Sequence, residues 1–199
     1  MNLRSSHFHP VALHHASRLI NHGPTVLVTS AHDNKRNVMA AAWSMPVNFE
    51  PPRIAVVIDA STYTKDLVCA SGAFGICIPG AGMIDTVYGV GNTSGRDTDK
   101  FVKYAINAFA GSTCGVPLIE QGCAAWLECR LLAEPRTQSA YDTFFGEVIA
   151  AAADTRIFSN GRWLLNNEHA DLHTIHHLGG GSFITAGNVL RARHNEIKS

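Results

Sequence analysis

The chain has 199 residues, of which 46% are hydrophobic, a composition that supports one domain with a buried core. Sixteen Lys and Arg residues balance sixteen Asp and Glu residues, which argues against a nucleic-acid binder and against a polybasic membrane surface. The sequence has neither a secretory h-region nor a run of roughly 18 apolar residues, so we expect a cytoplasmic protein without a membrane span.

The first predicted elements are strands. Residues 24–32 (PTVLVTSAH) are rich in β-branched side chains and end at the polar turn DNKRN, which predicts a hairpin whose return strand begins near Val38. RIAVVID (53–59) follows two prolines that disfavour a helix, and it predicts a third strand. AFGICIP (73–79) predicts a fourth.

Two helices are predicted next. STYTKDLVCASG (61–72) begins with hydroxyl residues, carries Asp66 in its first turn and stops at Gly72, a pattern typical of a short helix. DTDKFVKYAINAF predicts a helix from about Thr98. Its apolar face is formed by Phe101, Tyr104, Ala105 and Ala108.

The second half contributes two long strands, residues 123–137 and 142–154. Their apolar residues are too continuous for a strand with one wet face, so we expect burial on both sides, with a second subunit as one way to provide it. Many short strands and few helices indicate a mainly β (α+β) fold, a small β-barrel with helical insertions. Residues 1–199 are interpreted as a single domain.

Two hydroxyl-rich helix starts, at 61–65 and 91–100, indicate an anion site. A helix N-terminus presents unpaired N–H groups, Ser and Thr add hydroxyl donors, and Lys65, Arg96 and Lys100 add positive charge. Together these groups could hold a phosphate. The alternative is that the hydroxyls only cap a helix and that Ser94 and Gly95 form a turn.

The C-terminal histidines permit a different hypothesis. His169, His173 and His177 are spaced by four residues, which on a helix would align three imidazoles for a divalent metal ion. If the segment is extended instead, the histidines scatter and no site forms. HExxH is absent, so a metal-binding protein is the lower-ranked alternative, and we predict no metal site.

Five blocks, in order, resemble the flavin reductase-like family of FMN-binding split barrels, which includes flavoredoxin. They are PTVLVTS, NVMAAAWSMPVNFEPPRIAVVI, STYTKDLVCASGAFGICIP, GNTSGRDTDKF and FFGEV, and the resemblance covers a core of about residues 20–187, flanked by terminal extensions. It implies a six-stranded split β-barrel and a homodimer, with one non-covalent FMN per subunit near the dimer interface.

The resemblance also implies an oxidoreductase of the flavin reductase type, in which FMN accepts a hydride or electrons, with NAD(P)H as a candidate co-substrate. The alternative is an electron carrier like flavoredoxin, without NAD(P)H turnover of its own. A redox partner protein or a monooxygenase would then be the physiological partner.

The family pattern predicts the site residue by residue. The isoalloxazine and ribityl chain would lie along Asn37, Val38, Met39, Ala40, Ala41, Ala42 and Trp43. The ribityl-phosphate end would meet Ser61, Thr62, Tyr63, Thr64 and Lys65, and the phosphate would be held by Ser94, Gly95, Arg96 and Lys100. Ala40 and Ala42 replace the hydroxyl residues that are common in the family, so backbone N–H groups would have to serve. Tyr141 stands where the family often has a histidine near the flavin edge, and it is the one catalytic candidate.

Overall fold

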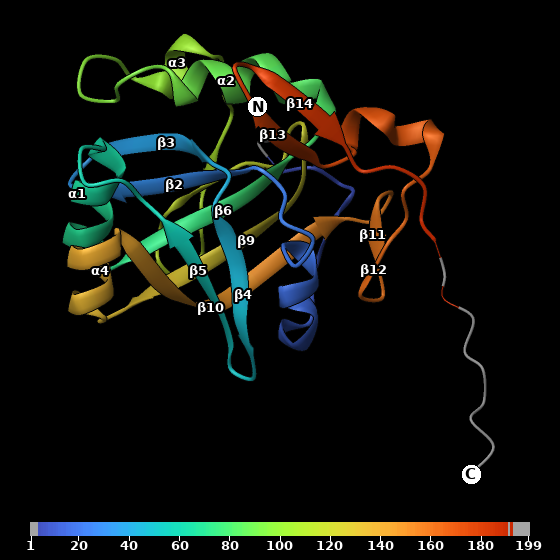
Figure 1. Ribbon diagram of the computed structural model, residues 1–199, viewed down its shortest axis with the longest axis horizontal. Helices are drawn as coiled ribbons and strands as arrows, with labels where there is room; N and C mark the ends of the chain where they lie inside the picture. The colour runs from blue at the N-terminus through green and yellow to red at the C-terminus, as the bar shows by residue number, and fades with distance from the viewer. Residues whose placement is uncertain (1–3, 191, 193–199) are drawn as a thin grey trace.

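A computed structural model describes residues 4–190 and 192 of the chain (Figure 1). The strands are β1 (Phe8–Pro10), β2 (Val26–His32), β3 (Lys35–Ala41), β4 (Ser44–Phe49), β5 (Pro52–Val57), β6 (Ala73–Pro79), β7 (Phe109–Ala110), β8 (Pro117–Leu118), β9 (Cys123–Leu132), β10 (Thr143–Asp154), β11 (Phe158–Ser159), β12 (Arg162–Trp163), β13 (Ile175–Gly179) and β14 (Ser182–Thr185). The α-helices are α1 (Tyr63–Ser71), α2 (Ile84–Gly91), α3 (Lys100–Lys103) and α4 (Pro135–Tyr141). Three 3₁₀ segments complete the fold: η1 (Leu13–Leu19), η2 (Ala81–Met83) and η3 (Asn167–Leu172).

The main sheet curls until its two edge strands meet. Its order is β3-β2-β6-β9-β10-β5-β4, and β1 pairs with β10. β3 and β4 are therefore the two ends of the path, although only Ala42 and Trp43 separate them in the sequence. Because a residue spans at most about 3.6 Å of extended chain, the two edges lie close together at this point. The expected mainly β split barrel is confirmed, with eight strands in the sheet where six were expected.

Apolar side chains are buried on both faces of the sheet. Neighbouring residues of one strand point to opposite faces, so Leu127 of β9 joins the cluster around Phe74 and Phe144. Trp126 joins a second cluster with Val87 of α2 and Phe101 of α3. The burial expected on both sides of β9 thus comes from the same chain: strands of the barrel interior cover one face, and helices α2 and α3 contribute to the cover of the other.

Strands β2, β5 and β6 and helix α1 occur where the sequence predicts them, and β3 begins at Lys35, earlier than the predicted start near Val38. The end signals of α1 act as expected. Thr62 is the N-cap, and its side chain accepts a hydrogen bond from the Lys65 N–H at 3.3 Å. Gly72 ends the helix with a left-handed φ of 68°, and its N–H donates to the Val68 carbonyl.

Two predicted elements are wrong in extent, and several were not predicted. The helix expected from Thr98 is reduced to the four residues of α3, capped by Asp99, because Ala105 adopts a φ of 50° that a helix cannot contain. The strand expected over 123–137 ends at Leu132, and Pro135 begins α4. Among the elements that no sequence pattern predicted are η1, α2, α4, β4 and the β13–β14 hairpin.

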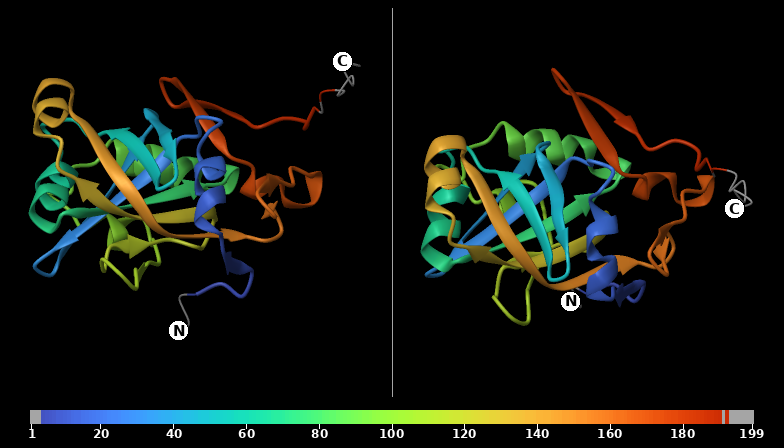
Figure 2. Two further views of the ribbon diagram at one scale, coloured as in Figure 1. Left: turned by 90° about the horizontal axis from the view of Figure 1, so that it is seen from below. Right: turned by 60° about the horizontal axis from the view of Figure 1, so that its bottom comes forward.

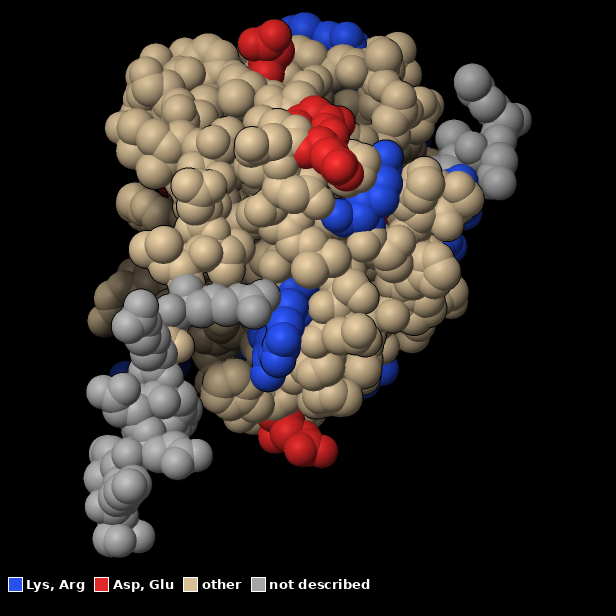
Figure 3. Space-filling view, turned by 90° about the vertical axis from the view of Figure 1, so that its right-hand side faces the viewer, with Lys and Arg blue, Asp and Glu red and all other residues tan. Residues whose placement is uncertain are grey.

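The helices gather at two places around the sheet (Figure 2). Helices α1 and α4 lie side by side at one end, whereas α2 and α3 cover β3, with the β13–β14 hairpin beside them. The side that carries β11 and β12 bears a few charged side chains of both signs on a largely uncharged surface (Figure 3). Within residues 4–190, no helix is long and apolar enough to cross a membrane.

Candidate functional site

Most of the residues predicted for the site line one elongated groove along β3. It consists of two adjoining cavities that share Ala40, Gly91 and Asn92. The first, which we call the hydroxyl end, has a volume of about 310 Å³ and is lined by the start of α1 and by the loop that precedes α3. The second, the hairpin end, has about 430 Å³ and is lined by Tyr88 of α2 and by His177, Gly180 and Phe183 of the β13–β14 hairpin.

Strand β3 forms the floor of the groove. Met39 and Ala40 line the hydroxyl end, and Ala40, Ala41 and Ala42 line the hairpin end. The three alanine methyl groups leave the backbone accessible to a flat molecule. These four residues are among those that the family pattern assigns to the isoalloxazine and ribityl chain.

Asn37 and Thr64 join the floor to the wall at the hydroxyl end. The Asn37 Nδ2 donates to Thr64 Oγ1 at 2.9 Å, and both side chains are buried. The Asn37 Oδ1 is buried without a hydrogen-bond partner in the described part of the chain. Since a buried acceptor without a donor is costly, this atom is suited to accept a hydrogen bond from a ligand hydroxyl.

Gly95 allows the loop before α3 to approach Asn37. A Cβ atom at this position would overlap the Asn37 carboxamide. Ser94 and Gly95 both line the hydroxyl end, as predicted. The close packing of the loop on β3 therefore requires a glycine at position 95. Ser94 and Gly95 thus belong both to a turn and to the lining of the candidate site.

Lys100 is the one buried cation at the hydroxyl end among the described residues. Its side chain lines the cavity, and Nζ donates to the carbonyls of Val38 in β3 (2.9 Å) and Val90 in α2 (2.8 Å). An ammonium has three donors, so one N–H remains for a ligand. Burial lowers the pKa of Lys100 to about 8, because the charged form loses hydration.

The start of α1 contributes hydroxyl and backbone groups. Ser61, Thr62, Tyr63 and Thr64 all line the hydroxyl end. The Ser61 hydroxyl donates to Asp59 at 2.6 Å, and the Thr62 hydroxyl donates to the Asp59 carbonyl at 2.8 Å. Thr62 also caps the Lys65 N–H. The N–H groups of Tyr63 and Thr64, the first two helical residues, have no acceptor within the helix, because no helical turn precedes them.

Five predicted residues do not line the groove: Val38, Trp43, Lys65, Arg96 and Tyr141. The Lys65 ammonium forms an ion pair with Asp142 at 2.7 Å, the Val38 side chain is buried in the core, and the Trp43 side chain is 75% exposed. Tyr141 is 74% exposed at the end of α4. Lys65 and Trp43 point away because neighbouring residues of a helix or strand point in different directions.

Arg96 directly follows Gly95 but does not line the hydroxyl end. Its guanidinium pairs with Asp66 at 2.7 Å and stacks over the Tyr63 ring, 5.4 Å from the centroid. About half of the side chain is exposed. The loop before α3 is thus fastened to helix α1.

Apart from Ala40, Ala41 and Ala42, the residues of the hairpin end were not among the predicted site residues. Residues Gly179, Gly180 and Gly181 have positive φ and form the tip of the hairpin, and Gly181 packs against the Tyr88 ring. The His177 and Phe183 rings lie 5.0 Å apart between centroids. The segment IHHLGGGSF contained the signal, since a triple glycine between apolar residues favours a tight hairpin.

The metal alternative is not supported by the described residues. His169, His173 and His177 do not share a helix: His169 has non-helical backbone angles, His173 follows η3, and His177 belongs to β13. No three His, Cys, Asp or Glu side chains within residues 4–190 are grouped to hold a metal ion. The helical alignment expected from the spacing is therefore wrong.

The fold and the groove define a class of protein: a split barrel with a flat, small-residue floor, an aromatic end and a cationic end. The Flavin reductase like domain matches residues 18–175, and the chain belongs to the flavin reductase-like family.

Three similar proteins are informative. The chain is 53% identical over 189 residues to uncharacterized protein YddH of Escherichia coli K12, covering 94% of this chain and 99% of that one. A crystal structure of an FMN-binding domain of a flavin reductases-like enzyme from Shewanella baltica is 38% identical, with a TM-score of 0.90 over 94% of this chain and 97% of that one. Flavoredoxin from Methanosarcina acetivorans is 27% identical, with a TM-score of 0.69 over 88% and 90%.

The lowered pKa of Lys100 predicts a dependence of stability on pH. Between about pH 8 and the ordinary value of 10.5, the unfolded chain keeps a proton that the folded protein has lost, so Lys100 adds stability as the pH rises. The free energy of unfolding of the wild type minus that of Lys100→Met should increase on the order of 2 kcal/mol across this range. Urea unfolding from pH 7.5 to 10.5 measures it, and the subtraction removes groups common to both proteins. A constant difference would contradict the prediction.

Proposed function

We propose that this protein binds FMN non-covalently in the groove along β3 and acts as an oxidoreductase. The observation that carries the proposal is the continuous floor of Met39 to Ala42, which joins an aromatic end to a cationic end. FMN has the matching parts: a flat ring, a polyhydroxyl chain and a phosphate. When bound, it supplies the capacity to accept a hydride or electrons.

The residues of the groove fit these parts. The hairpin end, with Tyr88, His177 and Phe183, suits the ring, and the unpaired Asn37 Oδ1 suits a ribityl hydroxyl. The phosphate fits at the start of α1, where the N–H groups of the first helical turn, the Thr64 hydroxyl and the third N–H of Lys100 are available as donors. The Shewanella baltica relative, which is an FMN-binding domain, supports the same assignment.

A second candidate is an electron carrier that reacts with a redox partner protein or a monooxygenase. It is favoured by the position of Tyr141, which is exposed and lines neither cavity, so the one catalytic candidate is absent from the groove. The similarity to flavoredoxin from Methanosarcina acetivorans also supports it. The two candidates share FMN and differ in whether NAD(P)H reduces it.

Two neighbouring alanines of β3 provide a test of FMN binding. Ala40 lines both cavities and is partly exposed, whereas Ala41 lines only the hairpin end and is largely buried in the core. Ala40→Leu should fill the groove and weaken FMN binding at least tenfold with little loss of stability. Ala41→Leu should cost about 1–3 kcal/mol of stability through overpacking.

Fluorescence titration of apoprotein with FMN and urea unfolding measure the two effects. A wild type that does not bind FMN would refute the proposed function. Equal FMN affinity in wild type and Ala40→Leu would show that FMN binds elsewhere.

Anaerobic mixing with NADH and NADPH separates the two candidates. If the protein is a reductase, we expect the absorbance of the bound flavin near its visible maximum to bleach with a stoichiometric amount of one nicotinamide. Dithionite is the control, because it reduces the flavin in either case. A flavin that bleaches with dithionite but with neither nicotinamide favours the electron carrier.

We further propose that the protein is a homodimer, through the face of β4. Four apolar side chains at alternate positions are exposed there: Trp43 (75%), Met45 (59%), Val47 (42%) and Phe49 (74%). β4 is an edge strand that, among the described residues, pairs with β5 alone, and contiguous exposed apolar residues mark interaction surfaces. Ala42 of the hairpin end directly precedes Trp43, so a second copy on this face would lie near the groove.

The double substitution Met45→Glu and Phe49→Glu should yield a monomer. Charged carboxylates cannot be buried in an apolar interface without a large cost, whereas on a free surface they are tolerated. Sedimentation equilibrium should give twice the mass of the 21.4 kDa chain for the wild type and the mass of one chain for the variant. Leu178→Glu is the control, because Leu178 is also exposed but lies on the hairpin. A monomeric wild type would contradict the proposal.

A further inference from the structure

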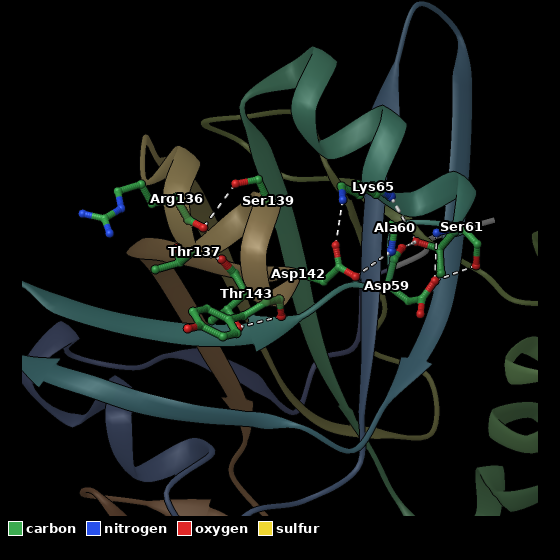
Figure 4. A network of polar contacts seen from close by, with 11 residues as sticks. Asp59, Ala60, Ser61, Lys65, Arg136, Thr137, Ser139, Asp142 and Thr143 are labelled. Carbon is green, nitrogen blue, oxygen red and sulfur yellow. Dashed lines mark hydrogen bonds and ion pairs between the residues drawn. The ribbon is translucent and has the colours of Figure 1, made fainter.

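The segment between β5 and α1 forms the wall of the hydroxyl end, and a network of polar contacts fixes it from behind (Figure 4). Residues Ser61 to Thr64 face the cavity. On the other side of the segment, Asp142 and the end of α4 approach Ala60 and Lys65. The wall therefore depends on residues that are about 80 positions away in the sequence.

Asp142 holds this segment at three points. Its carbonyl accepts the N–H of Ile58, just after β5, at 2.9 Å. Its carboxylate accepts the Ala60 N–H at 3.1 Å and pairs with the Lys65 ammonium at 2.7 Å. The three contacts span the end of the strand, the connecting turn and the first turn of α1, so one residue fixes both ends of the segment.

A second set of hydrogen bonds transmits this placement to the groove. Asp59 accepts the Ser61 N–H and hydroxyl through its side chain, at 2.8 and 2.6 Å, and the Thr62 N–H and hydroxyl through its carbonyl, at 3.0 and 2.8 Å. Thr62 then caps α1. The position of the donors at the start of α1 thus depends on the conformation of the turn formed by residues 59–62.

The backbone conformation of Asp142 is suited to holding the segment before α1. The residue is the C-cap of α4 with a left-handed φ of 50°, a conformation that Asp and Asn tolerate better than most other residues. Its carboxylate and the Lys65 ammonium are both about one-quarter exposed, so the ion pair is only partly screened by solvent. Neither side chain lines the groove.

We propose that Asp142 and Lys65 form a clamp that presets the anion-binding wall of the groove without touching the ligand, so both are positioning residues for the FMN phosphate. This inference rests on the proposed function. It assigns Lys65, which the family pattern places beside the ribityl-phosphate, to the support of that site. The clamp lowers the reorganisation that binding requires, which is how preorganisation raises affinity.

The test compares two aspartates at opposite ends of β10. Asp142→Asn keeps the left-handed backbone and the carbonyl that accepts from Ile58 but removes the charge that pairs with Lys65. Asp154→Asn, the matched control, breaks the ion pair with Arg156 at the other end of the strand, outside the groove. Asp142→Asn and Lys65→Met should each weaken FMN binding roughly 3- to 30-fold, and the double variant should be no weaker than the singles. Asp154→Asn should lower stability while leaving FMN affinity unchanged.

A readout without FMN separates positioning from general destabilisation. In the apoprotein, amide hydrogen exchange over residues 60–65 should accelerate in Asp142→Asn and not in Asp154→Asn. Lys65→Arg, which keeps the positive charge, should retain the exchange pattern of the wild type. Wild-type FMN affinity in Asp142→Asn, or strictly additive effects in the double variant, would overturn the clamp. If the wild type itself fails to bind FMN, the proposed function fails instead, and the exchange data still test the clamp.

Discussion

The groove depends on one buried ammonium group. Lys100 joins the carbonyl of Val38, in the floor, to the carbonyl of Val90, in the helix that forms the opposite wall. Burying a charge is costly unless its donors are satisfied, and here two carbonyls satisfy two of the three. The floor and the wall are thereby held at a fixed separation, and the remaining N–H leaves a positive site at the hydroxyl end. Two further contacts fasten the loop before α3 to β3. Gly95 packs closely on Asn37, and Arg36 forms an ion pair with Asp99 at 3.3 Å.

The elements that the sequence predicted well are those fixed by local signals. Helix α1 has a capping hydroxyl and a left-handed glycine within its own segment, and β2 and β6 are apolar runs bounded by turn residues. The failures lie where tertiary contacts decide. Apolar spacing favoured a long helix after Thr98, but the chain turns at Ala105 so that Ile106 can be buried beside Phe101. The continuous pattern of 123–137 did not reveal that β9 ends before Pro135.

The residues of the candidate site were predictable where they belong to short sequence motifs. Asn37, the alanines of β3, the start of α1, Ser94, Gly95 and Lys100 come together as the family pattern implies. The direction of individual side chains was not predictable from a motif. Lys65 follows the cap by three residues and turns toward Asp142, a contact that spans 77 positions. The hairpin end combines α2 with β13 and β14, which only the closed barrel brings together.

Closure of the barrel explains why the floor of the groove and the exposed apolar face adjoin. The chain passes from one edge of the sheet to the other through Ala42 and Trp43. Exposed edge strands tend to pair with other chains unless they are covered, and the two edges of this sheet differ in their cover. Helices α2 and α3 pack over β3, with the groove between them and the strand. At the β4 edge, Trp43, Met45 and Phe49 are exposed. Small residues are needed on the first strand so that a flat ligand can lie on its backbone, and large apolar residues on the second suit a protein surface. The abrupt change from three alanines to tryptophan in this segment therefore marks the boundary between the proposed ligand site and the proposed subunit interface.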